Sequence, residues 1–290
     1  QKEASIRSSQ SAEYVDMGIR LIVVERDDVN GKPLVPGNSE RMREVDRYER
    51  GGIVKVWFDD DGGRHAHIVR ASNNPKVWFA SRAQADLIIH DGAIPWVLVQ
   101  GSEGSGKTTV LAMWLAFRVI DHIGFEREIG CTAPTGPRIK NIKREIKRWW
   151  LPSWFRWRER DQQYVFHCGP TVQYLSAVQR SGEAGSPVQG NNWVAHGGDE
   201  LQDHSEREAD IIARGRSAPA RVCEPGQPAN DCWYPRLNTS TFRDSSVWRD
   251  FRAQCVANTT DWHVALLLGL QSPFIPLSHW KNTDYAVFMG

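Results

Sequence analysis

The chain has 290 residues, of which 40% are hydrophobic and 24% charged, and its formal net charge is +1 at pH 7. This composition is ordinary for a globular protein and excludes a polycation, so any contact with nucleic acid must come from a local basic patch. No apolar run approaches the roughly 20 residues that span a bilayer, and the N-terminal stretch lacks the apolar core of a secretion signal. The five cysteines form no CxxC pair, which argues against a disulfide framework or a zinc site and favours a reducing compartment.

The N-terminal quarter of the sequence predicts a small appendage. Residues 1–50 are polar and charge-mixed, and we expect a flexible or peripheral lead-in there. Residues 52–72 alternate between apolar and polar on both sides of an Asp-Gly-Gly turn, which is typical of a β-hairpin. His65 and His67 share one face of its second strand, where a solvated surface is a simpler interpretation than metal ligation. We therefore expect a lead-in or lid region over 1–76.

Strands and helices alternate in the next part of the chain. Residues 77–92 predict a short helix, and "PWVLVQ" at 95–100 predicts a strand buried on both faces. After a glycine-rich loop, an apolar helix is expected over 108–120. A second strand within 127–135 and an amphipathic helix over 138–150 follow.

The same alternation continues towards the C-terminal end. Residues 164–177 read as a hairpin, 191–200 contain a strand-like run, and 203–214 predict a charged helix. A proline-rich loop leads to "RLNTSTF" at 236–242, and 261–270 is the last apolar strand. Strands that alternate with helices predict an α/β fold with a mostly parallel central sheet flanked by helices.

The glycine-rich loop at 101–109 is the most specific motif in the sequence. It reads "GSEGSGKTT" and matches G-x-x-x-x-G-K-[ST] between a predicted strand and a predicted helix. Its glycines let backbone N–H groups face a phosphate, while Lys107 would reach the β- and γ-phosphates and Thr108 would bind Mg²⁺. The loop therefore predicts a P-loop NTPase domain of the RecA/ASCE-like kind over 77–290. The residues of the loop expected to bind nucleotide are Gly101, Ser102, Glu103, Gly104, Ser105, Gly106, Lys107, Thr108 and Thr109.

Hydrolysis also needs a carboxylate that holds the metal and one that orients the attacking water. Asp199 and Glu200 follow the strand-like "NNWVAH" at 191–196, but His-Gly-Gly interrupts the run, so a turn with two solvated acids is the alternative. No better pair follows the phosphate loop, and a predicted helix comes directly after this one. We expect Asp199 to hold Mg²⁺ and Glu200 to be catalytic. We also expect this strand to run beside the one carrying "PWVLVQ", with the glycines packing close to the phosphate loop.

Taken in order, these motifs resemble the large, or motor, subunit of the terminase of tailed bacteriophages, over roughly residues 78–281. Beside the phosphate loop and the acidic pair, the residues that carry the resemblance are Ala133, Pro134, Thr135, Gln189, Gly190, Thr239, Ser240, Thr241, Pro273, Phe274 and Trp280. The resemblance implies an ATPase that uses ATP and Mg²⁺ to drive double-stranded DNA into a procapsid.

The resemblance also implies partners and a location. It implies a portal or connector, a small terminase subunit, a ring of like subunits when assembled, no membrane, and the cytoplasm of the infected bacterial host, docked on the procapsid. Thr239, Ser240 and Thr241 would couple hydrolysis to movement, and they would then lie beside the acidic pair; an ordinary β-edge is the alternative. Large terminase subunits continue into an RNase H-like nuclease, for which residues up to Gly290 leave no room, so we assign no nuclease residues.

Two further site assignments depend on position along the chain. Gln84, upstream of the phosphate loop, would read the adenine or lie on a helix surface. An arginine normally neutralises charge on the γ-phosphate. In related terminases it lies a helix beyond the acidic pair, which favours Arg214 and Arg216 as catalytic residues. Arg180 and Arg138 are the weaker candidates.

Residues 138–160 form the strongest local basic patch, with nine Lys or Arg and two Glu. Apolar residues at helical spacing predict its buried face: Ile139, Ile142, Ile146 and Trp149. The basic residues expected on its exposed face are Lys140, Lys143, Arg144, Lys147 and Arg148. This face fits either a grip on phosphate backbone or a merely soluble helix surface. The tryptophans expected either to stack on bases or to pack against a neighbouring lobe or an adjacent subunit are Trp150, Trp154 and Trp157.

Two other functions stay open. A helicase-like or other nucleic-acid-stimulated ATPase shares this core, although a helicase needs a second RecA-like lobe for which these 290 residues are too few. A slow nucleotide-dependent assembly switch is the other, and the interrupted strand before Asp199 is what keeps it open.

Overall fold

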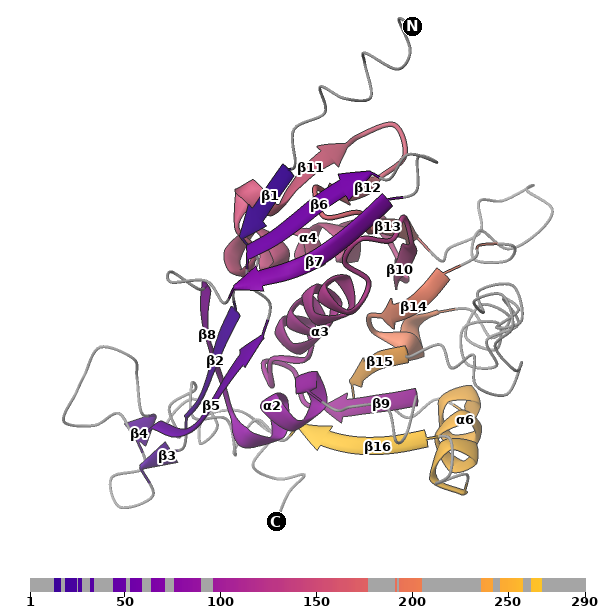
Figure 1. Cartoon of the computed structure of the whole chain (residues 1–290). Helices are drawn as coiled ribbons and strands as arrows, with labels where there is room; N and C mark the ends of the chain where they lie inside the picture. Colours follow the sequence, from indigo (N-terminus) through magenta and orange to yellow (C-terminus); the bar gives the residue numbers. More distant parts are fainter. Residues whose placement is uncertain are drawn as a thin grey trace, which may run out of the picture.

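The computed structural model describes the central part of the chain and shorter segments on either side (Figure 1). The described residues are 13–16, 19–24, 26–27, 32–33, 44–50, 53–58, 64–70, 76–89, 96–176, 191, 193–204, 236–241, 246–257 and 262–267. Within these ranges, no helix is both long enough and apolar enough to cross a membrane.

An eight-stranded sheet lies at the centre, in the order β11-β12-β13-β10-β14-β15-β9-β16. Its strands are β9 (Trp96–Gly101), β10 (Glu128–Ala133), β11 (Phe155–Arg158), β12 (Gln163–Phe166), β13 (Thr171–Ser176), β14 (Trp193–Gly198), β15 (Arg236–Thr241) and β16 (Trp262–Leu267). All neighbours from β13 to β16 in this order are parallel, whereas β11 and β12 are antiparallel additions at one edge. The predicted α/β fold with a mostly parallel sheet is confirmed, as is the hairpin formed by β12 and β13.

Helices cover both faces of this sheet (Figure 1). They are α2 (Arg82–Ile89), α3 (Lys107–Asp121), α4 (Gly136–Trp149) and α6 (Ser246–Ala257), with short 3-10 turns η1 (Pro152–Trp154) and η2 (Leu201–Asp203). Along β9, Val97 and Val99 enter the core that contains α3, whereas Leu98 enters the core that contains Cys255 of α6. Successive side chains of one strand thus enter two different cores, which explains the continuous apolar run predicted for it.

Helix α3 is the central helix of the fold. Its residues 110–117 are all at most 3% exposed, because the helix packs against the sheet and against α2 and α4. Full burial of a large apolar side chain contributes about 1.5–3 kcal/mol. The N-terminal end of α3, which the phosphate loop enters, is therefore held firmly against the sheet.

Helix α4 buries the apolar face that its spacing predicts, with Ile139, Ile142 and Ile146 in the core. Trp150 and Trp154 are buried as well, at 1% and 0% exposed, so the idea that they stack on bases is wrong. The reason is an aromatic cluster of Trp150 with residues of β11 and β12, which fills the space between α4 and this edge of the sheet. The helix thus has one buried apolar face and one exposed polar face.

The exposed face of α4 differs from the prediction at one position. Lys143 is half-buried: its Nζ lies 3.7 Å from the centroid of the Trp157 ring and donates to Gln162 Oε1 at 2.9 Å. The stem and ammonium of Lys143 therefore cover Trp157, which is partly buried beneath them.

The N-terminal part forms three small sheets, β1-β6-β7, β5-β2-β8 and β3-β4. Their strands are β1 (Glu13–Asp16), β2 (Ile19–Val24), β3 (Arg26–Asp27), β4 (Lys32–Pro33), β5 (Glu44–Arg50), β6 (Ile53–Phe58), β7 (Arg64–Arg70) and β8 (Lys76–Ala80). The hairpin predicted within 52–72 is confirmed as β6 and β7, which pair antiparallel. The side chains of His65 and His67 lie outside the described part.

Two expectations for this region are wrong. The expected lead-in over 1–50 contains strands, and Ile19, Leu21 and Val23 of β2 are buried at every second position. The helix expected over 77–92 begins only at Arg82, because the preceding residues belong to β8, which pairs parallel with β2. Aromatic and β-branched residues favour such a half-buried strand. Strand β8 runs from Lys76 to Ala80 and therefore spans the expected boundary between residues 76 and 77. The division of the chain into regions 1–76 and 77–290 stays a proposal.

Candidate active site

The phosphate loop connects the end of β9 to the first turn of α3. Gly104 and Gly106 have φ angles of 74° and 86°, in the left-handed region that favours glycine. A Cβ atom at Gly101 would lie 2.5 Å from Ser105 Oγ and 2.7 Å from the backbone oxygen of Leu267. Gly106 is also the N-cap of α3 and makes no side-chain cap. The first N–H groups of the helix are therefore available to an anion at the loop.

Lys107 lies against the phosphate loop and is only 5% exposed. Its Nζ donates to the backbone oxygens of Gly101 at 3.0 Å and Ser102 at 2.9 Å. Burial lowers the pKa of Lys107, and the charges of Glu200 and Asp199 oppose this shift. The ammonium group is thus close to both the loop and the acidic pair.

Gln84 contacts the loop from α2. Its Nε2 donates to the Ser105 oxygen at 3.4 Å, and its Oε1 accepts from the backbone N–H of Ser81 at 3.0 Å. Gln84 is 5% exposed, so the alternative of a surface helix residue is wrong. Both ends of the amide are thus bonded to protein backbone, at Ser81 and at Ser105 of the phosphate loop.

Strand β14, which carries the acidic pair, lies between β10 and β15. The expectation that it runs beside the strand carrying "PWVLVQ" is wrong, because β15 is inserted between β14 and β9. The backbone does run as a strand to Gly198, as expected. The carboxyl ends of parallel strands meet at one edge of the sheet, so the loop after β9 and the acids after β14 still share that edge.

The interruption by His-Gly-Gly has a packing explanation. A Cβ atom at Gly197 would lie 2.5 Å from Leu111 Cδ1 on α3, and one at Gly198 would lie 2.5 Å from Asn238 Oδ1 on β15. His196 is buried, with Nε2 2.9 Å from Thr132 Oγ1. The two glycines therefore let α3 and β15 approach β14 closely.

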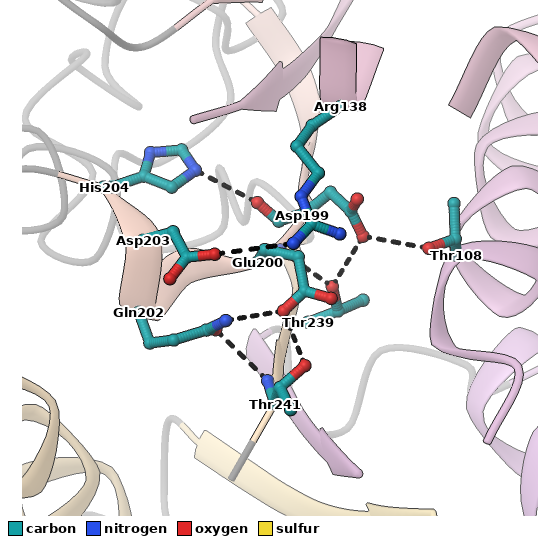
Figure 2. A network of polar contacts seen from close by, with 9 residues as sticks. All are labelled: Thr108, Arg138, Asp199, Glu200, Gln202, Asp203, His204, Thr239 and Thr241. Carbon is teal, nitrogen blue, oxygen red and sulfur yellow. Dashed lines mark hydrogen bonds and ion pairs between the residues drawn. The ribbon is translucent and has the colours of Figure 1, made fainter. Parts of the chain in front are cut away.

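Asp199 is buried and faces the start of α3 (Figure 2). Its Oδ1 accepts hydrogen bonds from Thr108 Oγ1 at 3.3 Å and from Thr239 Oγ1 at 2.9 Å. Its backbone N–H donates to the Thr132 oxygen at 2.9 Å. Burial and the neighbouring charge of Glu200 raise the pKa of Asp199 to about 6. The alternative of a solvated turn is wrong, because Asp199 and Glu200 are 2% and 8% exposed.

Glu200 is held by a second set of contacts. Its φ of 49° is one of two positive φ values among the described non-glycine residues. Its Oε2 accepts from Thr241 Oγ1 at 2.7 Å and from Gln202 Nε2 at 2.6 Å. Burial alone would raise the pKa of Glu200, but these hydrogen bonds and the charges of Lys107 and Arg138 lower it overall. Glu200 is therefore ionised at neutral pH.

Strand β15 supplies the hydroxyls that join the two acids (Figure 2). Thr239 Oγ1 accepts from the Glu200 N–H at 3.1 Å and donates to Asp199, and Thr241 Oγ1 donates to Glu200. Ser240, between them, points to the other face of the strand and donates to the Thr241 oxygen. Thus Thr239 and Thr241 lie beside the acidic pair, as the coupling hypothesis requires, and Ser240 does not. The alternative of an ordinary edge strand is wrong, because β15 has a neighbour on each side.

Two residues around the acids, His204 and Gln202, are not singled out by the sequence, and a third, Arg138, is named there only as a weaker candidate for the catalytic arginine. His204 is buried, its Nε2 lies 3.0 Å from the Asp199 oxygen, and burial lowers its pKa to about 4, so it is neutral. Gln202 bridges Glu200 and the Thr241 N–H. Arg138, on α4, reaches Asp203 with 3.8 Å between Nη2 and Oδ2. For His204 and Gln202 the only sequence signal is the polar run directly after the acidic pair.

The arginines favoured for catalysis, Arg214 and Arg216, lie outside the described residues. So do Arg180, the Gln189 and Gly190 pair, and all of the helix expected over 203–214 except Asp203, which ends η2, and His204, which is extended. Within the described part, Arg138 is the arginine whose charge acts on both Lys107 and Glu200.

The residues at this edge fit a magnesium ion. Thr108 and Asp199 offer a hydroxyl and a carboxylate oxygen, which are the ligands Mg²⁺ prefers, and they lie within 3.3 Å of each other. In the described part of the chain, no group of three or more His, Cys, Asp or Glu side chains is placed to hold a metal. A magnesium ion here would therefore take its other ligands from phosphates and water.

No protein-family model and no curated protein matches the chain. Solved structures do match, and the likeness concerns the α/β fold with its mostly parallel central sheet. The large terminase of a thermophilic bacteriophage matches with a TM-score of 0.52 and 14% identity, covering 70% of this chain and 51% of the terminase. The structure of the same terminase in complex with ATP-γ-S matches with a TM-score of 0.50 and 12% identity, covering 70% and 50%.

The chain thus spans about half the length of the large terminase that it matches. At such low identity the likeness concerns the fold alone. The fold of this chain therefore confirms the structural resemblance to the large terminase subunit. The matched protein is one whose structure contains an ATP analogue.

Proposed function

We propose that this chain is the ATP-hydrolysing motor domain of a phage terminase large subunit, which couples Mg-ATP hydrolysis to translocation of double-stranded DNA into a procapsid. One observation carries the proposal: Thr108 at the end of the phosphate loop and Asp199, 91 positions apart in the chain, lie at hydrogen-bond distance. The fold likeness to a large terminase supports it.

Nucleotide binding falls to the phosphate loop. The N–H groups at the start of α3 bind phosphate oxygens, and Lys107 exchanges its backbone partners for the β- and γ-phosphates. Gln84 keeps Ser105 and the loop in place. Thr108 and Asp199 would hold Mg²⁺, which would supply positive charge to neutralise the phosphate oxygens.

Hydrolysis falls to Glu200, which orients the attacking water. Its carboxylate is ionised and held by Thr241 and Gln202, so its direction is set before a water arrives. Preorganised groups of this kind cost no reorganisation during reaction. Arg214 and Arg216 stay the proposed source of the cation that neutralises the γ-phosphate.

Coupling falls to β15. Thr239 and Thr241 contact both acids, and the same strand lies directly beside β9, which leads into the phosphate loop. A change at the γ-phosphate that moves Asp199 or Glu200 therefore acts on β15 through hydroxyl contacts. The partners we propose are double-stranded DNA, a portal or connector, a small terminase subunit and further copies of the chain in a ring, in the cytoplasm of an infected bacterium.

Phosphate release tests the proposal. The purified chain with Mg-ATP should release phosphate at a rate that saturates with ATP and rises when duplex DNA is added. Lys107→Ala should lose ATP binding while its circular dichroism stays that of the parent chain. A chain that binds ATP but releases no phosphate, with or without DNA, would be an assembly switch and would overturn the motor proposal.

A further inference from the structure

The exposed face of α4 carries four cations, and we call these residues the α4 basic face: Lys140, Arg144, Lys147 and Arg148. All four side chains are exposed, while the apolar residues of the same helix enter the core. The lysine that the sequence would add to this face, Lys143, is turned onto Trp157 instead. The face is therefore a compact row of four charges along one helix.

No carboxylate among the described residues neutralises this row. Three acids lie on α4 or near its basic face, and each is engaged elsewhere. Glu145 accepts from Thr109 and Trp149, Glu159 accepts from Trp157 and Gln162, and Asp161 pairs with Arg158. The α4 basic face thus makes no ion pair with a described carboxylate and presents a local excess of positive charge, although the net charge of the whole chain is only +1.

The spacing of these charges matches a nucleic-acid backbone. From Lys140 to Arg148 the helix advances about 12 Å at about 1.5 Å per residue. Each strand of a DNA duplex carries one phosphate per about 3.4 Å of helix axis, so a similar length carries a similar number of opposite charges. With Trp150 and Trp154 buried and the Trp157 ring beneath the Lys143 ammonium, charge dominates this face. Such a surface recognises backbone and not base sequence.

The same helix contacts the nucleotide site on its other side. Thr109 of the phosphate loop donates to Glu145 Oε2 at 3.1 Å, and Trp149 Nε1 donates to the same oxygen at 3.2 Å. At the N-terminal end of α4, Arg138 lies 3.8 Å from Asp203, three residues after Glu200 (Figure 2). Helix α4 therefore contacts both the phosphate loop and the segment that follows the acidic pair.

We propose that the α4 basic face grips the phosphate backbone of duplex nucleic acid, and that Glu145 couples this grip to occupancy of the phosphate loop. The coupling rests on the proposed function as a nucleotide-driven motor. Phosphates that enter the loop displace Thr109, Thr109 carries Glu145 with it, and Glu145 shifts the helix that bears the cations. This route is separate from the contacts of β15 with the acids.

The salt dependence of binding tests the grip. Each phosphate contact contributes about 0.9 to the slope of log affinity against log salt concentration for duplex DNA. The double variant R144Q/K147Q should therefore lower the slope by about 1.8, measured by fluorescence anisotropy with a 30-base-pair duplex and the full chain. The matched double variant R82Q/R249Q removes two exposed arginines from α2 and α6, and it should leave the slope unchanged. Equal slopes for parent and R144Q/K147Q, or equal losses in both double variants, would overturn the grip.

The effect of nucleotide on DNA affinity tests the coupling. In the parent chain, ATP-γ-S should change the affinity for the duplex by about tenfold or more. E145A should bring the ratio of the two affinities close to 1, whereas E145Q, whose amide oxygen still accepts from Thr109 and Trp149, should preserve it. A merely structural role would lower DNA binding in both nucleotide states equally. An unchanged ratio in E145A would overturn the coupling.

The two proposals fail in different ways. If the parent chain releases no phosphate from Mg-ATP, the proposed function fails, and the salt slopes still decide whether the α4 basic face binds duplex backbone. If phosphate is released but R144Q/K147Q binds duplex like the parent, the proposed function stands and the grip on α4 is wrong.

Discussion

The two halves of the candidate active site are built in different ways. The phosphate loop is a single stretch, 101–109, whose shape depends on glycines in the left-handed region and on a buried helix behind it. The acidic half is assembled from separate parts of the chain: Asp199 and Glu200 follow β14, and the hydroxyls that hold them come from Thr239 and Thr241 on β15.

This difference decides what each half tolerates. The loop works through backbone N–H groups, so it depends on backbone conformation more than on side-chain identity, apart from Lys107 and Thr108. The acidic half works through side chains that must meet from two strands, so it depends on the spacing of β14, β15 and α3. Four substitutions test this contrast, and they follow in order of expected effect.

Glu200→Gln should lower ATP turnover by about 10³-fold, roughly 4 kcal/mol, because the amide cannot orient or accept a proton from the attacking water. ATP affinity should stay close to that of the parent chain, since binding belongs to the other half. Phosphate release and equilibrium binding of a fluorescent ATP analogue measure the two effects. Glu126→Gln, at an exposed position, is the matched control. Undiminished turnover in Glu200→Gln would remove Glu200 from the reaction.

Thr239→Val should lower turnover by about 10²-fold, because the valine keeps the shape but leaves Asp199 and the Glu200 N–H without their shared partner; small misplacements of reacting groups have costs of this size. Ser240→Ala is the matched control, since Ser240 points away from the acids, and its turnover should stay within about twofold of the parent. Similar losses in both variants would show that β15 contributes packing alone.

Gly197→Ala should lower the free energy of unfolding by about 1–3 kcal/mol, because the new methyl group would meet Leu111 on α3 in a filled core. Gly136→Ala is its matched control: a Cβ atom there has nothing within 4 Å, and exposed substitutions of this kind change stability by less than about 0.5 kcal/mol. Urea unfolding followed by tryptophan fluorescence measures both. If the two variants are equally stable, close packing does not explain the glycine.

Gln84→Ala should weaken ATP binding by about fivefold, near 1 kcal/mol, the contribution of a neutral hydrogen bond. Because both ends of the amide contact protein, we expect ATP and GTP to be affected by the same factor. Isothermal titration with each nucleotide measures this. A loss confined to ATP would instead show that Gln84 reads the adenine.

The sequence predicts the loop half almost completely. A nine-residue motif between a buried strand and a helix depends on local backbone physics, and the apolar spacing of α3 and α4 likewise predicts their buried faces. The two hairpins and the last strand are predicted for the same reason, because alternation and turn residues are local signals.

The sequence does not predict how the acidic half is assembled. Strand order depends on which side chains fit across a sheet, and where β15 pairs with β14, Asn238 lies so close to Gly198 that a Cβ atom there would meet it. Long-range pairing also explains why residues 77–80 form a strand and not a helix. They belong to β8, which pairs with β2 more than fifty residues earlier in the chain. The contact of His204 with Asp199 depends on the conformation of the turn after β14. The spacing of apolar residues in the sequence does not predict that conformation.

The left-handed backbone conformation of Glu200 has an energetic cost. A non-glycine residue in the left-handed region costs roughly 1–2 kcal/mol, and here that cost falls on the residue whose carboxylate is proposed to orient water. Glycine would adopt this φ of 49° freely, yet it has no carboxylate. Stability and the proposed function therefore favour different residues at this position. If the proposed function holds, a chain with glycine there would be more stable and would keep its phosphate loop, but it would lack the carboxylate that orients water.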